Sequence, residues 1–392
     1  MTDYAERIDK VVESLKTDLT ELTLKIHDNP ELGRQEVKAC RWQTELLEKY
    51  GFETETPFAG FETAYKAVYR GKKDGPNIAM LAEYDALPEL GHGCGHNLIA
   101  MIGVGAGIAM REFADEIGAN IYVIGTPAEE TEGLKVPMAN AGVFDDMDVA
   151  MMSHPAAVYI DSANTMAIHS YKISFRGKTA HAAAAPEEGL NALDAMINLF
   201  NMVNAMRQQT KDDARIHGII TNGGVAPNII PDYTECIFYV RANKCSDVEE
   251  LSKRVENCAK GAAIGAGVEY EMVEVEGQFK DTRSNVYLAH LYAEQMEKQG
   301  IPVMRISEQY MSGSSDLGDV SYRCPAIQSG FDISGGRGYG PHTVEFAQCA
   351  GSEEAIEAAF PVIKAFVMTA VELMTEPAHL EAIKEEFKKI EE

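Results

Sequence analysis

The feature that most constrains the fold is a set of three apolar runs that each end in polar, potentially metal-binding side chains. The runs open the segments NIAMLAEYDA (77–86), NIYVIGTPAEE (120–130) and DVAMMSHP (148–155). A long apolar stretch, NLIAMIGVGAGIAM (97–110), reads as a buried helix between the first two. Buried strands alternating with helices predict an open α/β sheet, which builds its site in the loops at the carboxyl ends of its strands.

The loop after the first run, EYDALPELGHGCGH (83–96), is the densest group of such side chains. It contains Glu83, Asp85, His92, Cys94 and His96, all of them possible metal ligands or supports for ligands. We expect the metal site to begin in this loop.

Later segments add further candidates, namely Glu129, Glu130, His154 and His342. Thiolate, imidazole and carboxylate groups together suit zinc or a similar ion. The set exceeds what one tetrahedral ion needs, and two ions sharing a ligand would use all of it. One of the adjacent glutamates could then bind metal while the other serves as a general base. Taken singly, each residue has an ordinary alternative as a packed or solvated side chain.

The middle of the chain reads as a separate module. Its pattern is β-α-β-β-α-β over about 110 residues, the order of a ferredoxin-like domain. We therefore expect a domain at 168–280 that is inserted between two parts of a larger domain, 1–167 and 281–392. A chain of 392 residues is too long for one ordinary core, which agrees with two domains.

Composition limits the partners and the compartment. With 35 basic and 61 acidic residues the net charge is −26, which argues against nucleic acid and anionic membranes as partners. No apolar run is expected to reach the length of a membrane span, and the charged, amphipathic N-terminal residues show no apolar core of the secretory kind. Seven scattered cysteines without a CxxC pair indicate a reducing cytoplasm.

Five motifs in this order resemble a known family: EYDALPELGHGCGH, GTPAEE, MMSHP, GKTAHAAAAP and GPHTVEF. They are similar to those of the dinuclear-metal aminoacylase and carboxypeptidase G family of metallopeptidases. The cysteine-containing amidohydrolase branch, which acts on aminobenzoyl-glutamate, hippurate and amino-acid conjugates, is the most similar. The resemblance runs from NPELGRQE (29–36) to the final helices.

The resemblance implies a doubly wound α/β catalytic domain of the zinc-exopeptidase type, with the inserted ferredoxin-like domain serving for dimerisation and as a lid. It implies two divalent ions per subunit, most simply Zn or Mn, bridged by Cys94. By the same resemblance, His96 and His154 complete one metal position, and Glu130 and His342 the other. The expected substrate is a small N-acyl amino acid, an aminobenzoyl-glutamate-like conjugate or a dipeptide.

The remaining roles also rest on the resemblance. Glu129 would be the general base, and Asp85 would support a ligand imidazole, as ligating histidines require. His181, in the inserted domain, would reach the site of the partner subunit in a homodimer and stabilise the oxyanion. Asn228 and Arg241 would bind the carboxylate of the substrate. Glu83 stands where other branches carry a metal-binding histidine, and His92 reads as structural.

Two alternatives stand beside the metal-dependent amidohydrolase. A non-catalytic binding or assembly protein on the same fold predicts that a ligand is missing, and none is. A thiol hydrolase would use Cys94 as nucleophile and His96 as base. That pair is only two residues apart, which suits a base poorly, and it leaves Glu130, His154 and His342 unexplained.

Overall fold

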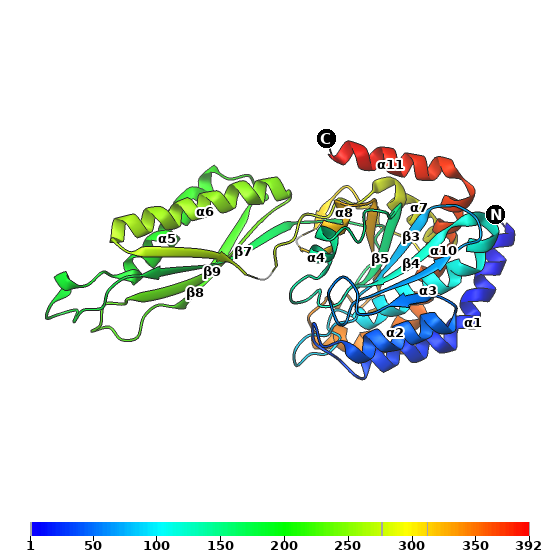
Figure 1. Cartoon of the computed structure of the whole chain (residues 1–392), viewed down its shortest axis with the longest axis horizontal. Helices are drawn as coiled ribbons and strands as arrows, with labels where there is room; N and C mark the ends of the chain where they lie inside the picture. Colours follow the sequence, from blue (N-terminus) through cyan, green and yellow to red (C-terminus); the bar gives the residue numbers. More distant parts are fainter. Residues whose placement is uncertain (1, 276, 312, 392) are drawn as a thin grey trace. The chain divides into compact units, whose positions relative to one another are not determined.

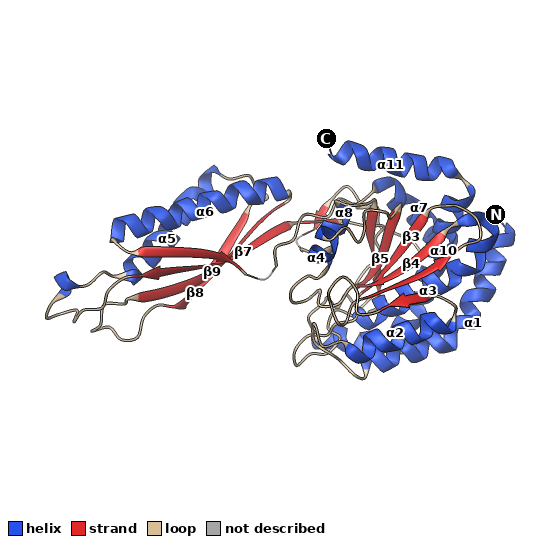
Figure 2. Cartoon of the chain, in the orientation of Figure 1, coloured by secondary structure: helices blue, strands red, loops and turns tan. Residues whose placement is uncertain are grey.

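The computed structural model describes residues 2–275, 277–311 and 313–391, and it divides into two compact units (Figures 1 and 2). The first unit comprises the chain up to Asn164, Thr282–Met311 and the chain from Asp316 onward. The second unit spans Thr165–Asp281, with a short return of the chain at 313–315. The sequence places the insert at 168–280, without that return.

A six-stranded mixed sheet forms the centre of the first unit, in the order β1-β2-β4-β3-β5-β12. The last four strands in this order are mutually parallel, whereas β2 runs antiparallel to β4 and to β1. The strand bounds are β1 Glu53–Glu55, β2 Tyr65–Arg70, β3 Asn77–Ala82, β4 Asn120–Gly125, β5 Val149–Ala156 and β12 Ala326–Asp332. The shorter strands β6 and β11 span Asn164–Thr165 and Tyr310–Met311.

Helices cover both faces of this sheet. The larger apolar core joins α1 (Thr2–His27), α3 (His96–Phe113), α7 (Val286–Lys298) and α10 (Glu353–Thr375) to one face. A smaller core beneath α4 (Lys135–Asn140) and α8 (Leu317–Ser321) covers the other. The remaining helices are α2 (Val37–Lys49), the π-helical turn Ala114–Gly118, α9 (Val344–Ala350) and α11 (Pro377–Glu391). This doubly wound arrangement confirms the predicted fold class. The short helices α4, α8 and α9 were not predicted from the sequence.

Strands β3, β4 and β5 are the three apolar runs of the sequence. Residues 78–82 of β3 are buried throughout, because helices cover both of its faces, so the strand reads as a continuous apolar run. In parallel register Ile78 lies opposite both Ile121 of β4 and Val149 of β5, so the carboxyl ends of the three strands meet at one edge. The polar loops that follow them therefore converge.

The second unit has the predicted β-α-β-β-α-β order. Its elements are β7 (Ala167–Arg176), α5 (Ala192–Met206), β8 (Arg215–Asn222), β9 (Tyr233–Ala242), α6 (Cys245–Ala266) and β10 (Glu269–Glu274), with short 3₁₀ turns at Pro186–Glu188 and Arg207–Gln209. The antiparallel sheet has the order β10-β7-β9-β8, and α5 and α6 share an apolar core with it. This order confirms the ferredoxin-like topology of the insert.

The expectation that no apolar segment reaches the length of a membrane span was wrong. Two helical segments, His96–Gly118 and Glu353–Thr375, are long and apolar enough to cross a membrane by length and composition alone. Their most apolar windows are 89% and 72% buried inside the protein. Core helices that are packed on several sides become apolar around most of their circumference, so they pass the same test.

Candidate metal centre

The structure brings the five predicted ligands together in the first unit. The potential donor atoms of Cys94, His96 and His154 lie within 4.8 Å of one another. Those of Cys94, Glu130 and His342 form a second such group. Cys94 belongs to both groups, so the residues describe two adjacent donor sets that share one sulfur.

The backbone around Gly95 aims two of these side chains. Gly95 precedes α3 with φ +72°, a left-handed conformation that glycine adopts without steric cost. A Cβ at this position would lie 2.8 Å from Cγ of Pro155, the residue after His154. The tight turn lets Cys94 and His96, which are two residues apart, serve the same site from the beginning of α3.

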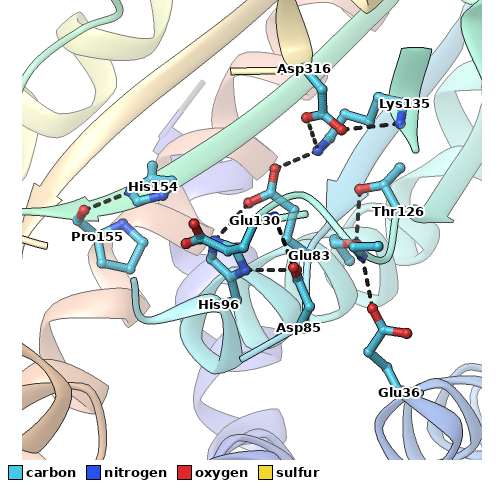
Figure 3. Close-up of polar contacts among 12 residues, drawn as sticks. Glu36, Glu83, Asp85, His96, Thr126, Glu130, Lys135, His154, Pro155 and Asp316 are labelled. Carbon is cyan, nitrogen blue, oxygen red and sulfur yellow. Dashed lines mark hydrogen bonds and ion pairs between the residues drawn. The ribbon is translucent and has the colours of Figure 1, made fainter. Parts of the chain in front are cut away.

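Hydrogen bonds fix the orientation of both buried imidazoles. His96 Nδ1 lies 2.9 Å from Asp85 Oδ1, which leaves Nε2 facing Glu83 Oε2 at 3.4 Å and Glu130 Oε1 at 3.6 Å (Figure 3). His154 Nδ1 donates to the Pro155 carbonyl at 2.7 Å. In each ring one nitrogen is occupied by its support, and Nε2 remains available for a metal.

His342 directly follows the Gly-rich segment SGGRGYGP (334–341). Its backbone is left-handed, with φ +64°, and its amide donates to the Gly93 carbonyl at 2.9 Å. This bond ties the segment to the Cys94 loop. His342 Nε2 thereby lies 3.5 Å from Glu130 Oε2.

The donor set fits divalent metal ions. His96 Nε2, Glu130 Oε1 and Glu83 Oε2 are buried and have no hydrogen-bond partner among the described residues. Burial raises the pKa of the Cys94 thiol to about 12. Burial would lower the pKa of His96, but Asp85 and Glu83 outweigh it and hold that pKa well above its usual range. Since a metal ligates thiolate and neutral imidazole, metal binding here must displace protons.

Glu129 and Glu130 occupy a loop that neighbouring elements hold in place. The Glu130 amide donates to Asp85 Oδ2 at 3.0 Å, so Asp85 supports both the His96 ring and this loop. Burial, followed by the charges of Glu83 and Asp316, raises the pKa of Glu129 well above its ordinary value. A carboxyl group with a raised pKa accepts a proton more readily, as a general base must.

A buried charge network that was not predicted from the sequence lies beside Glu129. The ammonium of Lys135 lies 2.5 Å from Glu83 Oε1 and 2.6 Å from Asp316 Oδ1, and all three side chains are fully buried (Figure 3). Oxygen atoms of Glu83, Asp316 and Glu129 lie within 4.8 Å of one another. The sequence carried no distinct signal for Lys135, because a single lysine in GLKVPMAN resembles a solvated residue.

The carboxyl groups and the ammonium group of this network shift one another's pKa values. Burial would lower the pKa of Lys135, but Asp316 and Glu83 outweigh it and keep the lysine charged. Burial would raise the pKa of Glu83, yet Lys135 and His96 hold it below its ordinary value. Burial raises the pKa of Asp316 to about 6, with Lys135 opposing the increase.

His92 belongs to neither of the two donor groups that share Cys94. Its Nε2 donates to the Ile26 carbonyl at 3.2 Å, and its ring stacks on His27 with 6.2 Å between the centroids. Burial lowers the pKa of His92 to about 3, so the ring is neutral. These contacts agree with the structural role that the sequence indicated.

The other predicted site residues lie in the second unit. His181 and Asn228 come from adjacent segments, because the Ala182 amide donates to the Asn228 carbonyl at 3.0 Å. The exposed His181 accepts bonds from the amides of Ala183 and Ala184 at Nδ1, so its Nε2 carries the proton in the neutral ring.

Arg241 lies apart from these two residues, on β9. Its Nη1 is 3.1 Å from Ser314 Oγ, and its Nε is buried without a hydrogen-bond partner among the described residues. The guanidinium group therefore still has donor capacity.

Comparisons with known proteins match both units. Residues 165–265 match the family described as the peptidase dimerisation domain. The Xaa-Arg dipeptidase of Mus musculus is 38% identical over 405 aligned positions, which cover 98% of this chain and 91% of that protein. One of the subunits of the p-aminobenzoyl-glutamate hydrolase of Escherichia coli is 33% identical over 286 positions, covering 67% of this chain and 59% of that protein.

Solved structures show the same fold at lower identity. A dinuclear metal-binding peptidase of the M20 family from Bacillus subtilis superposes with a TM-score of 0.72 at 18% identity, covering 92% of this chain and 99% of its own. An aminobenzoyl-glutamate utilization protein from Klebsiella pneumoniae gives a TM-score of 0.72 at 19% identity, with coverage of 92% and 98%. Because the dipeptidase relative extends over nearly the whole chain, and the matched domain and fold agree with it, the chain belongs to the M20 family of peptidases.

Proposed function

We propose that this protein is a metal-dependent hydrolase that cleaves the amide bond of a dipeptide or a small N-acyl amino acid. The observation that carries the proposal is the pair of donor groups sharing Cys94. His96 and His154 would hold one ion with Cys94, and Glu130 and His342 would hold the other. Bound there, the ions would polarise the scissile carbonyl and ease deprotonation of water. The soft thiolate and the imidazoles favour Zn, whereas the carboxylate also suits Mn.

Glu129 is the proposed proton carrier of the reaction. Its side chain lies beside the donor groups, since its oxygen is within 4.8 Å of donor atoms of His96 and Glu130. It accepts the proton of the attacking water and delivers it to the leaving nitrogen. The same carboxyl acts as base and then as acid, so its raised pKa serves both steps.

Recognition of the substrate is assigned to the second unit. We propose that Arg241 and Asn228 bind the substrate carboxylate, because the guanidinium group matches a two-oxygen anion. Since Asn228 lies next to His181 and apart from Arg241 in one chain, it would reach the carboxylate from the partner subunit together with His181. His181, with its proton on Nε2, donates to the oxyanion that forms at the attacked carbonyl. It does so from the partner subunit of a homodimer, which the match of 165–265 to a dimerisation domain supports.

The relatives suggest which substrates to test first. One is named for dipeptides with carboxyl-terminal arginine, and another for p-aminobenzoyl-glutamate. Purified protein loaded with Zn or Mn should hydrolyse at least one compound in a panel of Xaa-Arg dipeptides, aminobenzoyl-glutamate and N-acyl amino acids. Glu129→Gln should bind the same number of ions and lose turnover. Full activity of that variant would disprove the assigned mechanism.

Two further experiments separate the proposal from its alternatives. Mixing His181→Ala protomers with Glu129→Gln protomers should restore part of the activity if the subunits share their sites. Proven heterodimers without any activity would contradict that sharing. A thiol hydrolase would keep its activity in the presence of a chelator, whereas the metal enzyme loses it and recovers when metal is added.

All seven cysteines are free, which supports our inference of a cytoplasmic location.

A further inference from the structure

The side chain of Glu36 is fully buried, and its place at the start of α2 does not explain why a carboxyl group is buried there. It is the N-cap residue of α2, yet its side chain makes no capping bond to that helix. Both oxygens accept from other segments: Oε1 accepts from the Ala128 amide at 2.8 Å, and Oε2 accepts from Thr63 Oγ1 at 2.9 Å. No cation pairs with this carboxyl in the described part of the chain.

The residue that Glu36 holds has an unusual backbone. Ala128 is fully buried and has φ +58°, a conformation that alanine rarely adopts. It stands immediately before Glu129. A non-glycine residue keeps such a conformation only where its surroundings enforce it, and such residues cluster at functional sites.

Contacts from two directions enforce it here. Glu36 accepts the bond of the Ala128 amide, and Asp85 accepts that of the Glu130 amide. The segment before Glu36 packs directly on the same loop, since a Cβ on Gly33 would lie 2.4 Å from Thr131 Oγ1 and 3.0 Å from the Ala128 Cβ. The backbone amides on both sides of Glu129, those of Ala128 and Glu130, are therefore each hydrogen-bonded to a carboxyl group.

We propose that Glu36 is a positioning residue that sets the direction of the Glu129 carboxyl through the backbone of Ala128. The inference rests on the proposed role of Glu129 as general base. Glu36 touches neither the donor groups nor the substrate in this assignment. Its contribution is geometric, because a small displacement of a reacting group is enough to slow catalysis.

The proposal requires an oxygen acceptor at Glu36 rather than a negative charge. A neutral carboxyl or a carboxamide can still accept from the Ala128 amide through one oxygen, while its other atom donates to Thr63 Oγ1. Burial also raises the pKa of Glu36 to about 7, with the Asp85 charge adding to the increase, so both forms of the carboxyl occur near neutral pH. Glu36→Gln is thus the conservative variant, and Glu36→Ala is the disruptive one.

The test combines kinetics with hydrogen exchange of the metal-loaded protein. Glu36→Ala should lower kcat by about 10²-fold with a small change in KM. The amides of 126–133 should exchange faster in this variant, and bound metal should stay at the wild-type level. Glu36→Gln should restore both kcat and slow exchange. Thr63→Val, which frees only the second oxygen, should give intermediate values and covers the case in which Glu36→Ala does not fold.

Several results would overturn the inference. These are wild-type kcat in Glu36→Ala, a loss of kcat without faster exchange at 126–133, a defect in Glu36→Gln as large as that of Glu36→Ala, or wild-type values in Thr63→Val. Amide exchange reports how firmly the backbone of the loop is held, whether or not Glu129 is the base. Faster exchange in Glu36→Ala together with a fully active Glu129→Gln would count against the proposed mechanism and leave the structural link between Glu36 and the loop intact.

Discussion

Replacing Lys135 by methionine should destabilise the first unit strongly. The ammonium of Lys135 is fully buried between Glu83 and Asp316, at 2.5 and 2.6 Å. Methionine fills a similar volume but leaves both carboxylates in the interior without a cation. Removing one partner of a buried ion pair costs about 3–5 kcal/mol, and two carboxylates lose their partner here. We therefore expect a loss of about 5 kcal/mol in the free energy of unfolding at pH 8.

The sign of the pH dependence provides a second check. Without Lys135, the pKa values of the two carboxyls in the folded protein rise above their values in the unfolded chain. Carboxyls shifted in this direction destabilise the protein at high pH, and the penalty disappears as they become protonated. The difference between Lys135→Met and wild type should therefore be smaller at pH 5.5 than at pH 8.

The only tryptophan of the chain allows the unfolding of the first unit to be followed separately from that of the second. Trp42 lies on α2 and packs against the larger core of the first unit, so its fluorescence during urea unfolding reports on that unit. Wild type and variants are compared in the same metal state, because a bound ion stabilises the folded protein. Lys25→Met, which breaks an exposed pair on α1, is the matched control and should change little.

A compensating variant tests the cause of the loss. Glu83→Gln, Lys135→Met and Asp316→Asn together remove the charges and should recover much of the lost stability, because buried ion pairs can be replaced by neutral groups at low cost. The reasoning would be refuted if Lys135→Met lost less than about 1 kcal/mol at pH 8, the value of an exposed pair. A loss that increases as the pH falls would refute it equally.

Three further predictions concern the metal centre. Binding of Zn should release protons from His96 and Cys94, so the affinity for Zn should weaken as the pH falls. Titration calorimetry in buffers of different ionisation enthalpy measures the number of protons released. A value of zero would contradict the pKa directions given above. Asp85→Asn should lower metal affinity 10–100-fold, because His96 loses its orienting carboxylate, and competition with a chromogenic chelator would detect the change. Gly95→Ala should reduce metal content and thermal stability, because Gly95 has a left-handed backbone and a Cβ there would clash with Pro155. Unchanged metal content together with an unchanged melting temperature would show that the turn is less constrained than described.

The sequence was sufficient for the parts of the site that follow from strand ends. Parallel strands place their carboxyl ends together, so the loops after β3 and β4 and the end of β5 had to converge, and with them Cys94, Glu130 and His154. The period of apolar residues likewise indicated the inserted unit and its topology. Patterns of this kind are local, or follow from one rule of chain connection.

Long-range contacts were beyond this reasoning. Lys135 and Asp316 are 181 residues apart, and Ala128 and Glu36 are 92 apart. Nothing near either partner in the sequence specifies the other. A buried lysine and a carboxyl that supports a strained alanine look like ordinary surface residues until the fold brings their partners to them.

The interruption of the first unit by the second also determines the order in which the parts can form during synthesis. Strand β12 pairs with β5, and α10 packs on α1 and α3, so the larger core needs segments from both ends of the chain. The ferredoxin-like sheet needs only residues 167–274. On the ribosome this sheet can close while the strands before it still await β12. We therefore expect a translating chain halted after about residue 320 to have a folded insert, with its first 160 residues still sensitive to protease.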